Sequence, residues 1–196
     1  ENQLKELEKL SFIKKIESVR KFKKIKSVEK ETEVKDGLSK SSSIHSLDYG
    51  LSFTQNNLSD IPGVHDLGIS GEGVIIGLLD SGFDWQTPNA LKDRDVIAEY
   101  DFVYNDNVTA NESNDASGSQ HNHGTSVFSI LAGYDEGNLI GPAYNASFLL
   151  AKTEFIVTET NVEEDNYAAA LEWMDSIGVD ITTSSLGYSE FDVGQS

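Results

Sequence analysis

The sequence predicts an α/β fold: a three-layer, doubly wound, mostly parallel sheet with helices on both faces. Short apolar runs without polar alternation recur along the chain, and such runs are typical of strands that are buried on both faces. Segments with helical patterns lie between them, and this short alternation implies parallel strands joined by right-handed crossovers. A chain of 196 residues, 38% of them hydrophobic, can bury a core of ordinary size.

The expected elements follow from residue type and from the signals at their ends. Strands are expected at 74–79, 96–103, 147–152 and 179–184, and helices around 123–133 and 161–177. The second helix has the clearest limits, because Asn161 can cap it, Glu163 and Glu164 favour its positive end, and Gly178 ends it.

Two polar residues follow apolar segments in a way that indicates proton-transfer chemistry. Asp80 ends the first expected strand, which places it at the edge where open α/β sheets bind ligands. His123 begins a helix 43 residues later, and Gly124 beside it allows close backbone approach. Imidazole is the side chain best suited to proton transfer near neutral pH. As partners, Asp80 and His123 should lie about 2.6–3.2 Å apart.

Four motifs, in this order along the chain, resemble the subtilisin-like serine proteases, or subtilases. They are Asp80-Ser81-Gly82, His123-Gly124-Thr125, the segment 141–146 before an expected strand, and Ser185-Leu186-Gly187. The resemblance covers about residues 45–190. It implies a subtilisin-like fold and a serine endopeptidase whose triad follows the order Asp, His, Ser.

The resemblance also assigns roles to individual residues. His123 would take the proton of the nucleophilic serine, and Asp80 would fix the tautomer of His123. Ser185, Leu186 and Gly187 would bind an extended peptide substrate as an added strand.

The family's nucleophile motif, Gly-Thr-Ser followed by small residues and a proline, does not occur in this sequence. Gly124-Thr125-Ser126 imitates it, but Ser126 lies three residues after His123 on the same expected helix. The nucleophilic serine and the oxyanion-hole asparagine are therefore expected beyond Ser196. The sheet is then incomplete at its carboxyl-terminal side. We expect the 196 residues alone to be inactive and to need a carboxyl-terminal fragment of the same protein as a partner.

Charge divides the chain near residue 40. Residues 1–40 hold 12 of the 15 Lys and Arg and 8 of the 33 Asp and Glu, a net charge of +4, which leaves −22 on the remainder. By the resemblance, residues 1–40 are the tail of an inhibitory prodomain with a linker, and residues 41–196 are the amino-terminal part of the catalytic domain. The resemblance further implies a secreted protein that is made as a zymogen, with cleavage of the chain around Lys35 to Ser43. The alternative for 1–40 is a solvated basic helix for nucleic acid or membrane.

Two other classes of site use some of the same residues. Asp80 and Asp84 suggest a magnesium-dependent phosphatase, but Gly82 occupies the position where that chemistry needs a second acid. His121 and His123 suggest a metal-dependent hydrolase, but no histidine follows His123 as a further ligand. His121, His45 and His65 are therefore interpreted as ordinary structural residues.

The expected chemistry requires no cofactor, and no metal site is assigned to it. The acidic loop Asp101, Asn105, Asp106 and Asn107 offers oxygen ligands suited to a structural calcium ion, and a solvated loop explains it as well. Cysteine is absent, which excludes disulfides and thiolate sites. Neither a membrane span nor a nucleic acid partner is expected. The alternative function is a catalytically inactive, protease-like binding module with an acidic surface.

Overall fold

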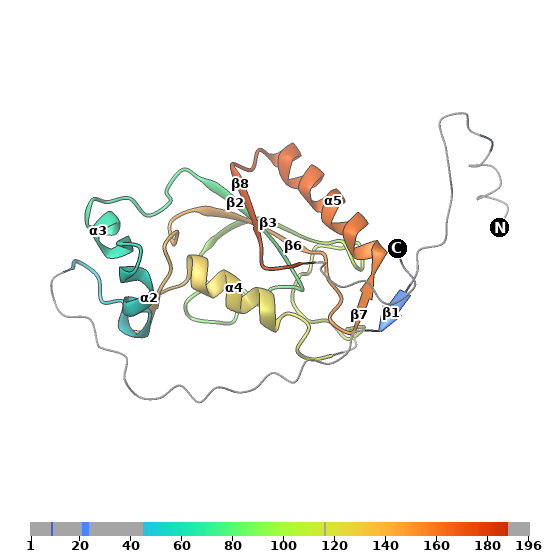
Figure 1. Ribbon diagram of the computed structural model, residues 1–196, viewed down its shortest axis with the longest axis horizontal. Helices are drawn as coiled ribbons and strands as arrows, with labels where there is room; N and C mark the ends of the chain where they lie inside the picture. The colour runs from blue at the N-terminus through green and yellow to red at the C-terminus, as the bar shows by residue number, and fades with distance from the viewer. Residues whose placement is uncertain (1–8, 10–20, 24–44, 116, 188–196) are drawn as a thin grey trace.

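The computed structural model describes residue 9 and residues 21–23, 45–115 and 117–187. Its centre is a parallel sheet in the order β3-β6-β2-β8. These strands are β3 (Asp95–Asp101), β6 (Ser147–Lys152), β2 (Ile75–Asp80) and β8 (Ile181–Ser184). Helices α4 (Asn122–Ala132) and α5 (Asn161–Ile177) flank the sheet (Figure 1). The predicted α/β fold with a mostly parallel sheet is confirmed.

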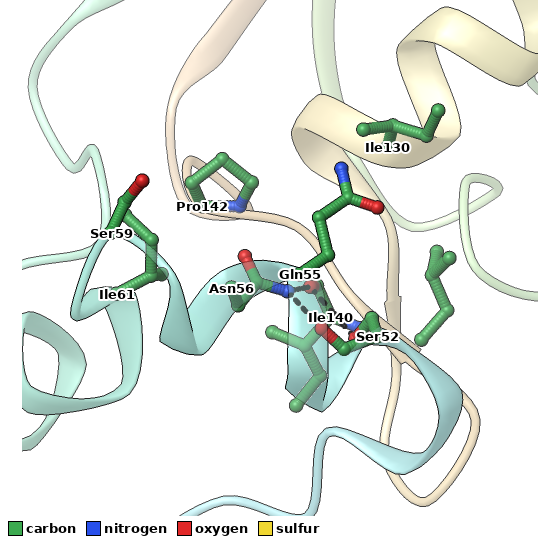
Figure 2. Close-up of a pocket in the computed structure, with 9 residues that line it drawn as sticks. Ser52, Gln55, Asn56, Ser59, Ile61, Ile130, Ile140 and Pro142 are labelled. Atoms are coloured by element: carbon green, nitrogen blue, oxygen red, sulfur yellow. Dashed lines mark hydrogen bonds between the residues drawn. The ribbon is translucent and has the colours of Figure 1, made fainter. Parts of the chain in front are cut away.

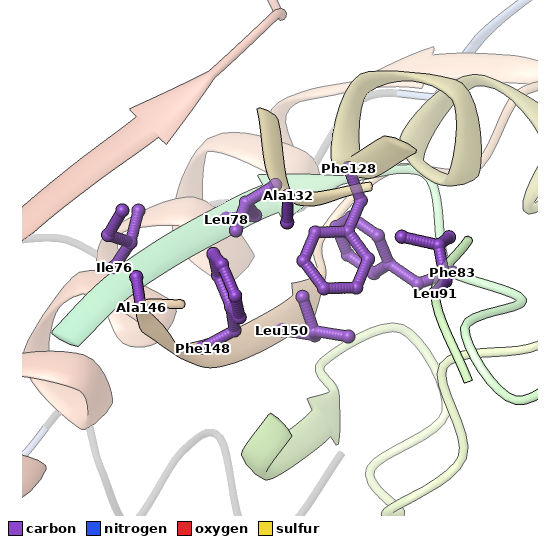
Figure 3. Packing of buried hydrophobic residues seen from close by; sticks show 9 residues of the cluster. All are labelled: Ile76, Leu78, Phe83, Leu91, Phe128, Ala132, Ala146, Phe148 and Leu150. Atoms are coloured by element: carbon purple, nitrogen blue, oxygen red, sulfur yellow. The ribbon is translucent and has the colours of Figure 1, made fainter. Parts of the chain in front are cut away.

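The two central strands bury alternate side chains in two separate clusters. The cluster that includes α4 contains Ile76, Leu78, Phe83, Leu91, Phe128, Ala132, Ala146, Phe148 and Leu150 (Figure 3). The cluster that includes α5 contains Leu79, Leu149, Ala151, Ala170 and Met174. Because side chains alternate along a strand, a continuous apolar run is what a strand covered on both faces requires.

The limits of these elements agree with the expected ones to within two residues. Helix α5 runs from Asn161, has Glu163 and Glu164 in its first turn, and ends before Gly178. Gly178 has φ +98°, a left-handed conformation that glycine adopts without strain at a helix end. The end signals in the sequence therefore identified this helix correctly.

Several shorter elements have no counterpart in the sequence-based prediction. They are η1 (Gly50–Ser52), α2 (Phe53–Asn57), α3 (Ile61–Asp66), and the hairpin of β4 (Tyr134–Asp135) and β5 (Leu139–Ile140). Gly50 has φ +51°, and a Cβ atom there would lie 2.3 Å from the carbonyl oxygen of Gly137. Elements of two to six residues are too short to show a hydrophobic period, so tertiary contacts determine them.

One pairing joins distant parts of the chain. Strand β1 (Lys21–Lys23) pairs antiparallel with β7 (Thr158–Thr160), with Phe22 opposite Glu159 (Figure 1). Strand β1 belongs to the expected prodomain segment 1–40, most of which lies outside the described residues. Strand β7 lies between β6 and α5 in sequence.

Strand β8 is an edge of the sheet as far as the structure describes it. It pairs with β2 on one side, and its residues Ile181, Thr182 and Thr183 are exposed. The side chain of Ile181 is an apolar group on this edge, and the residue is 56% exposed. Across the described part of the chain, no helix is long and apolar enough to cross a membrane.

Within residues 45–66, His45 and Ser46 contact Asp66, and His65 fastens the segment to the rest of the domain. The ring of His45 lies 2.7 Å from Asp66 Oδ2, while the Ser46 hydroxyl and backbone N–H donate to Asp66 Oδ1 at 2.6 and 2.9 Å. The hydrogen bonds from Ser46, followed by that from His45, lower the pKa of Asp66 to about 2. His65 is buried; its Nε2 donates to the carbonyl oxygen of Pro142 at 3.0 Å, and its Nδ1 lies 2.6 Å from the Tyr49 hydroxyl.

The lowered pKa of Asp66 predicts acid sensitivity of this segment. A depressed folded-state pKa contributes stability above the ordinary value of 3.8, and this contribution is lost as the pH falls from about 4 to about 2. We expect Asp66→Asn to flatten the pH dependence of the melting temperature in this window, whereas Glu72→Gln, the same charge change at an exposed acid, leaves it unchanged. Equal profiles for the two variants would contradict this assignment.

Candidate active site

Asp80 is held at the carboxyl end of β2 by the backbone that follows it. It is 1% exposed, and its Oδ1 accepts the Ser81 backbone N–H at 2.7 Å and the Ser81 hydroxyl at 3.1 Å. Its carbonyl oxygen accepts the N–H of Thr153 at 2.9 Å, which ties the strand end to the chain after β6. A buried carboxylate needs such donors, because an unpaired charge in the interior is costly.

His123, near the start of α4, faces this carboxylate. Its Nδ1 lies 2.8 Å from Asp80 Oδ1 and 3.0 Å from Asp80 Oδ2. The His123 side chain is 54% exposed, whereas that of Asp80 is 1% exposed. The pair therefore has a buried acid and an open imidazole, within the distance range expected from the sequence.

Two glycines make this contact sterically feasible. A Cβ atom on Gly124 would lie 2.2 Å from the carbonyl oxygen of Gly82 and 2.9 Å from Asp80 Cβ. Gly82 has φ +129°, and a Cβ there would lie 2.5 Å from the carbonyl oxygen of Thr109. The hydroxyl of Thr125 accepts the N–H of Asp84 at 2.8 Å and donates to the His121 carbonyl at 2.7 Å, which joins the turn after β2 to α4.

The other candidates on α4 have structural contacts. His121 Nδ1 accepts the backbone N–H of Asn111 at 3.0 Å, and the His121 N–H donates to Asn111 Oδ1 at 2.9 Å, so this ring fastens the preceding loop. The Ser126 hydroxyl donates to the carbonyl oxygen of Asn122 at 2.9 Å, as a helix residue does. His121 and Ser126 therefore agree with their interpretation as ordinary residues.

A buried ion triad lies beside the pair at the same edge of the sheet. Lys152, which is paired with Asp80 in the register of β2 and β6, has its Nζ 2.8 Å from Asp101 Oδ2 and 3.0 Å from Asp115 Oδ1. Burial by itself would lower the pKa of Lys152, but the hydrogen bonds and charges of Asp101 and Asp115 outweigh it and raise that pKa. The Lys152 ammonium also lies 4.7 Å from the centre of the Tyr104 ring.

The acidic loop contributes to a cluster of oxygen atoms. One carboxylate oxygen each of Asp101, Asp106 and Glu112 lies within 4.8 Å of the others. Burial, followed by the charge of Asp106, raises the pKa of Glu112. These are ligand types that calcium accepts. Since Asp101 already pairs with Lys152, its charge is balanced by the protein, and we propose no metal here.

The residues expected to bind substrate lie on a different segment from β7, the strand to which β1 pairs in the structure. Ser185, Leu186 and Gly187 follow β8, whose parallel pairing with β2 brings them to the same sheet edge as Asp80; Ser185 and Gly187 are exposed and Leu186 is half-buried. The antiparallel strand addition in the structure occurs instead at β7. Strand β7 was not predicted from the sequence, because three residues are too few to show an alternating pattern.

A pocket of about 230 Å³ lies away from this edge (Figure 2). It is lined by Ser52, Gln55, Asn56, Ser59, Ile61, Ile130, Leu139, Ile140 and Pro142. These residues come from the region of η1, α2 and α3 together with α4 and β5. The pocket contains neither Asp80 nor His123, and the candidate site is therefore the open edge of the sheet.

A family model described as the subtilase family matches residues 71–196, which include Asp80 and His123. The chain belongs to the subtilase family. This family consists of serine proteases, and the resemblance found in the sequence is thereby confirmed. The match covers more than half of the chain and contains the central sheet, α4 and α5.

Two similar proteins agree with the family. The minor extracellular protease Vpr of Bacillus subtilis (strain 168) is 29% identical over 125 residues, which are 63% of this chain and 15% of Vpr. This subtilase chain thus spans less than a sixth of that relative. The structure of the Clostridium perfringens CspB protease superposes with a TM-score of 0.51 at 22% identity, over 71% of this chain and 34% of that one. This second similarity supports the fold.

The close approach at Gly124 predicts a large effect from one methyl group. We expect Gly124→Ala to push the start of α4 away from β2, because the new Cβ meets the buried Asp80 at the end of β2 and the Gly82 carbonyl oxygen in the turn after it. The distance between His123 Nδ1 and the Asp80 carboxylate should then exceed hydrogen-bonding range in a crystal structure of the variant. Gly118→Ala is the control, since nothing lies within 4 Å of a Cβ there. An unchanged distance in Gly124→Ala would contradict the steric argument.

Proposed function

We propose that this chain contributes the acid and the base of an Asp-His-Ser triad to a serine endopeptidase. The observation that supports the proposal is the contact of 2.8 Å between His123 Nδ1 and the buried carboxylate of Asp80, in a chain of the subtilase family. The nucleophilic serine would come from the carboxyl-terminal continuation of the same protein. We refer to the chain with that continuation as the full-length protein.

The geometry suits general base catalysis. With Nδ1–H donating to Asp80, the lone pair of His123 lies on Nε2, on the open side of a half-exposed ring. Nε2 would take the proton of the serine hydroxyl as its oxygen bonds to the peptide carbonyl carbon. It would then give that proton to the leaving amine as the carbon–nitrogen bond breaks. Asp80 stabilises the intervening imidazolium and fixes its orientation.

The catalytic pair predicts two variants with different effects. In the full-length protein, His123→Ala should remove nearly all peptidase turnover without unfolding the domain, since the ring is half-exposed. Asp80→Asn should lower turnover by a factor of about 10⁴, because the amide favours the wrong tautomer of His123. Peptide hydrolysis and labelling by a fluorophosphonate measure both effects.

His45→Ala is the matched control, because His45 contacts Asp66 at the end of α3 and contacts neither Asp80 nor His123 in any described hydrogen bond, so turnover should be unchanged. A wild-type full-length protein that neither hydrolyses peptides nor reacts with the fluorophosphonate would reject the peptidase. It would favour the alternative, an inactive binding module.

The same proposal gives residues 1–40 the role of an inhibitory prodomain. The pairing of β1 with β7 supports it, because this segment adds to the domain as a peptide would, by main-chain pairing. The opposite net charges of +4 and −22 favour the association. The exposed edge at β8 supports a carboxyl-terminal partner fragment. Secretion is supported by the name of the relative Vpr, an extracellular protease.

The prodomain role predicts retention that depends on salt. A site for a specific protease is placed in the linker at Ser39–Ser43 of the full-length protein, and the linker is cleaved. Residues 1–40 should then remain bound during gel filtration at low ionic strength and dissociate near 1 M salt, where the screening length falls to about 3 Å. Release of the segment at low salt, or retention that is independent of salt, would contradict an electrostatically held prodomain.

A further inference from the structure

Gln120 is a buried amide that joins three functional segments. The residue is 1% exposed. Its Nε2 donates to the carbonyl oxygen of Ser81 at 2.8 Å and to that of Glu154 at 2.7 Å. Its Oε1 accepts the backbone N–H of Ile156 at 3.1 Å. Both donor hydrogens of the amide and one oxygen lone pair are thus used by the main chain.

The three partners of Gln120 belong to two parts of the candidate site, the turn after β2 and the segment between β6 and β7. Ser81 is the residue whose N–H and hydroxyl hold the carboxylate of Asp80. Ile156 lies two residues before β7, the strand to which the amino-terminal segment pairs. Gln120 itself lies three residues before His123. One side chain therefore connects the acid, the base and the strand that receives a peptide.

The donor and acceptor needs of the three partners are met by a glutamine side chain. Two partners are carbonyl oxygens that need a donor, and the third is an N–H that needs an acceptor. A carboxylate of the same size would face two carbonyl oxygens without a hydrogen to give them. An apolar side chain of the same length would leave three buried main-chain groups without their partner, which is unfavourable in the interior.

We propose that Gln120 is a positioning residue that fixes β7 relative to the Asp80–His123 pair and thereby determines the preference for long peptide substrates. The inference rests on the proposed endopeptidase function. A long substrate would pair with β7 while its scissile bond lies at His123. A shift of β7 relative to His123 would therefore move the scissile bond away from the imidazole. A displacement of about 1 Å can cost about 10²-fold in rate.

Substrates too short to reach β7 serve as the internal control for long ones. The Asp80–His123 contact has its own support, from Ser81 and from the close approach at Gly124. A single-residue ester that does not reach β7 depends on that pair alone. Loss of the Gln120 bridge should therefore affect long substrates far more than short ones.

The test uses Gln120→Met and Gln120→Glu in the full-length protein. Methionine keeps the length of the side chain and removes the hydrogen bonds, and glutamate keeps its shape and removes both donors. We expect kcat/KM for an eight-residue peptide amide to fall about 10- to 100-fold, and that for a single-residue ester to change less than about 3-fold. The matched control is Gln55→Met, on α2 beside the pocket of Figure 2.

A second measurement does not depend on activity. The linker is first cleaved at Ser39–Ser43, and the dissociation rate of residues 1–40 is then measured. This rate should be at least about 10-fold higher for the Gln120 variants than for wild type or Gln55→Met, because β1 in residues 1–40 pairs with β7 and a displaced β7 pairs less well. The proposal would be overturned if kcat/KM fell equally for the eight-residue amide and the single-residue ester in both variants. It would also be overturned if the ratio of these two kcat/KM values stayed as in wild type.

Failure of the proposed function gives a different pattern. A wild-type protein that hydrolyses neither substrate rejects the peptidase, and dissociation of residues 1–40 then decides the role of Gln120. Equal dissociation from wild type and both Gln120 variants would overturn the proposal in that case as well. Where Gln120→Met melts below the assay temperature, Gln120→Glu, which keeps the volume of the side chain, supplies the same comparisons.

Discussion

The candidate site depends on the close approach of the turn after β2 to the first turn of α4. Gly82 and Gly124 allow it, because any side chain at either position would overlap main-chain oxygen atoms. The approach brings the buried Asp80 within 2.8 Å of His123 while the imidazole stays open to solvent. The hydrogen bond from the Ser81 backbone N–H to Asp80 and the one from Gln120 to the Ser81 carbonyl oxygen both lie at this junction.

Charges at this sheet edge are divided into separate pairs. Asp101 and Asp115 share the ammonium group of Lys152, although Lys152 is the neighbour of Asp80 in the strand register. The carboxylate of Asp80 therefore contacts His123 and the neutral donors of Ser81. The separation matters for the proposed chemistry, since a carboxylate neutralised by a lysine would stabilise an imidazolium less. The buried triad also fastens the loop that leads back to α4, because Asp115 belongs to that loop.

Strands β7 and β8 each offer a place at which another segment can pair with the domain. Strand β7 receives the amino-terminal segment by antiparallel pairing, and β8 leaves an edge with the exposed Ile181. Unpaired strand edges favour addition of another strand. The arrangement therefore suits a domain that receives other segments at two different places, β7 in a two-stranded sheet and β8 at the edge of the central sheet. The net charges of +4 on residues 1–40 and −22 on the remainder favour the pairing at β7.

The sequence by itself determined the central strands, the two long helices, and the positions of Asp80 and His123, because burial on both faces and helix-end signals are local patterns. Only the tertiary structure decided that Lys152 pairs with Asp101 and Asp115, that β7 pairs with β1, and that Gln120 joins three segments. These contacts link residues far apart in sequence, and a single lysine, a three-residue strand or one glutamine shows no periodicity. Their partners are selected by the geometry of the folded sheet edge.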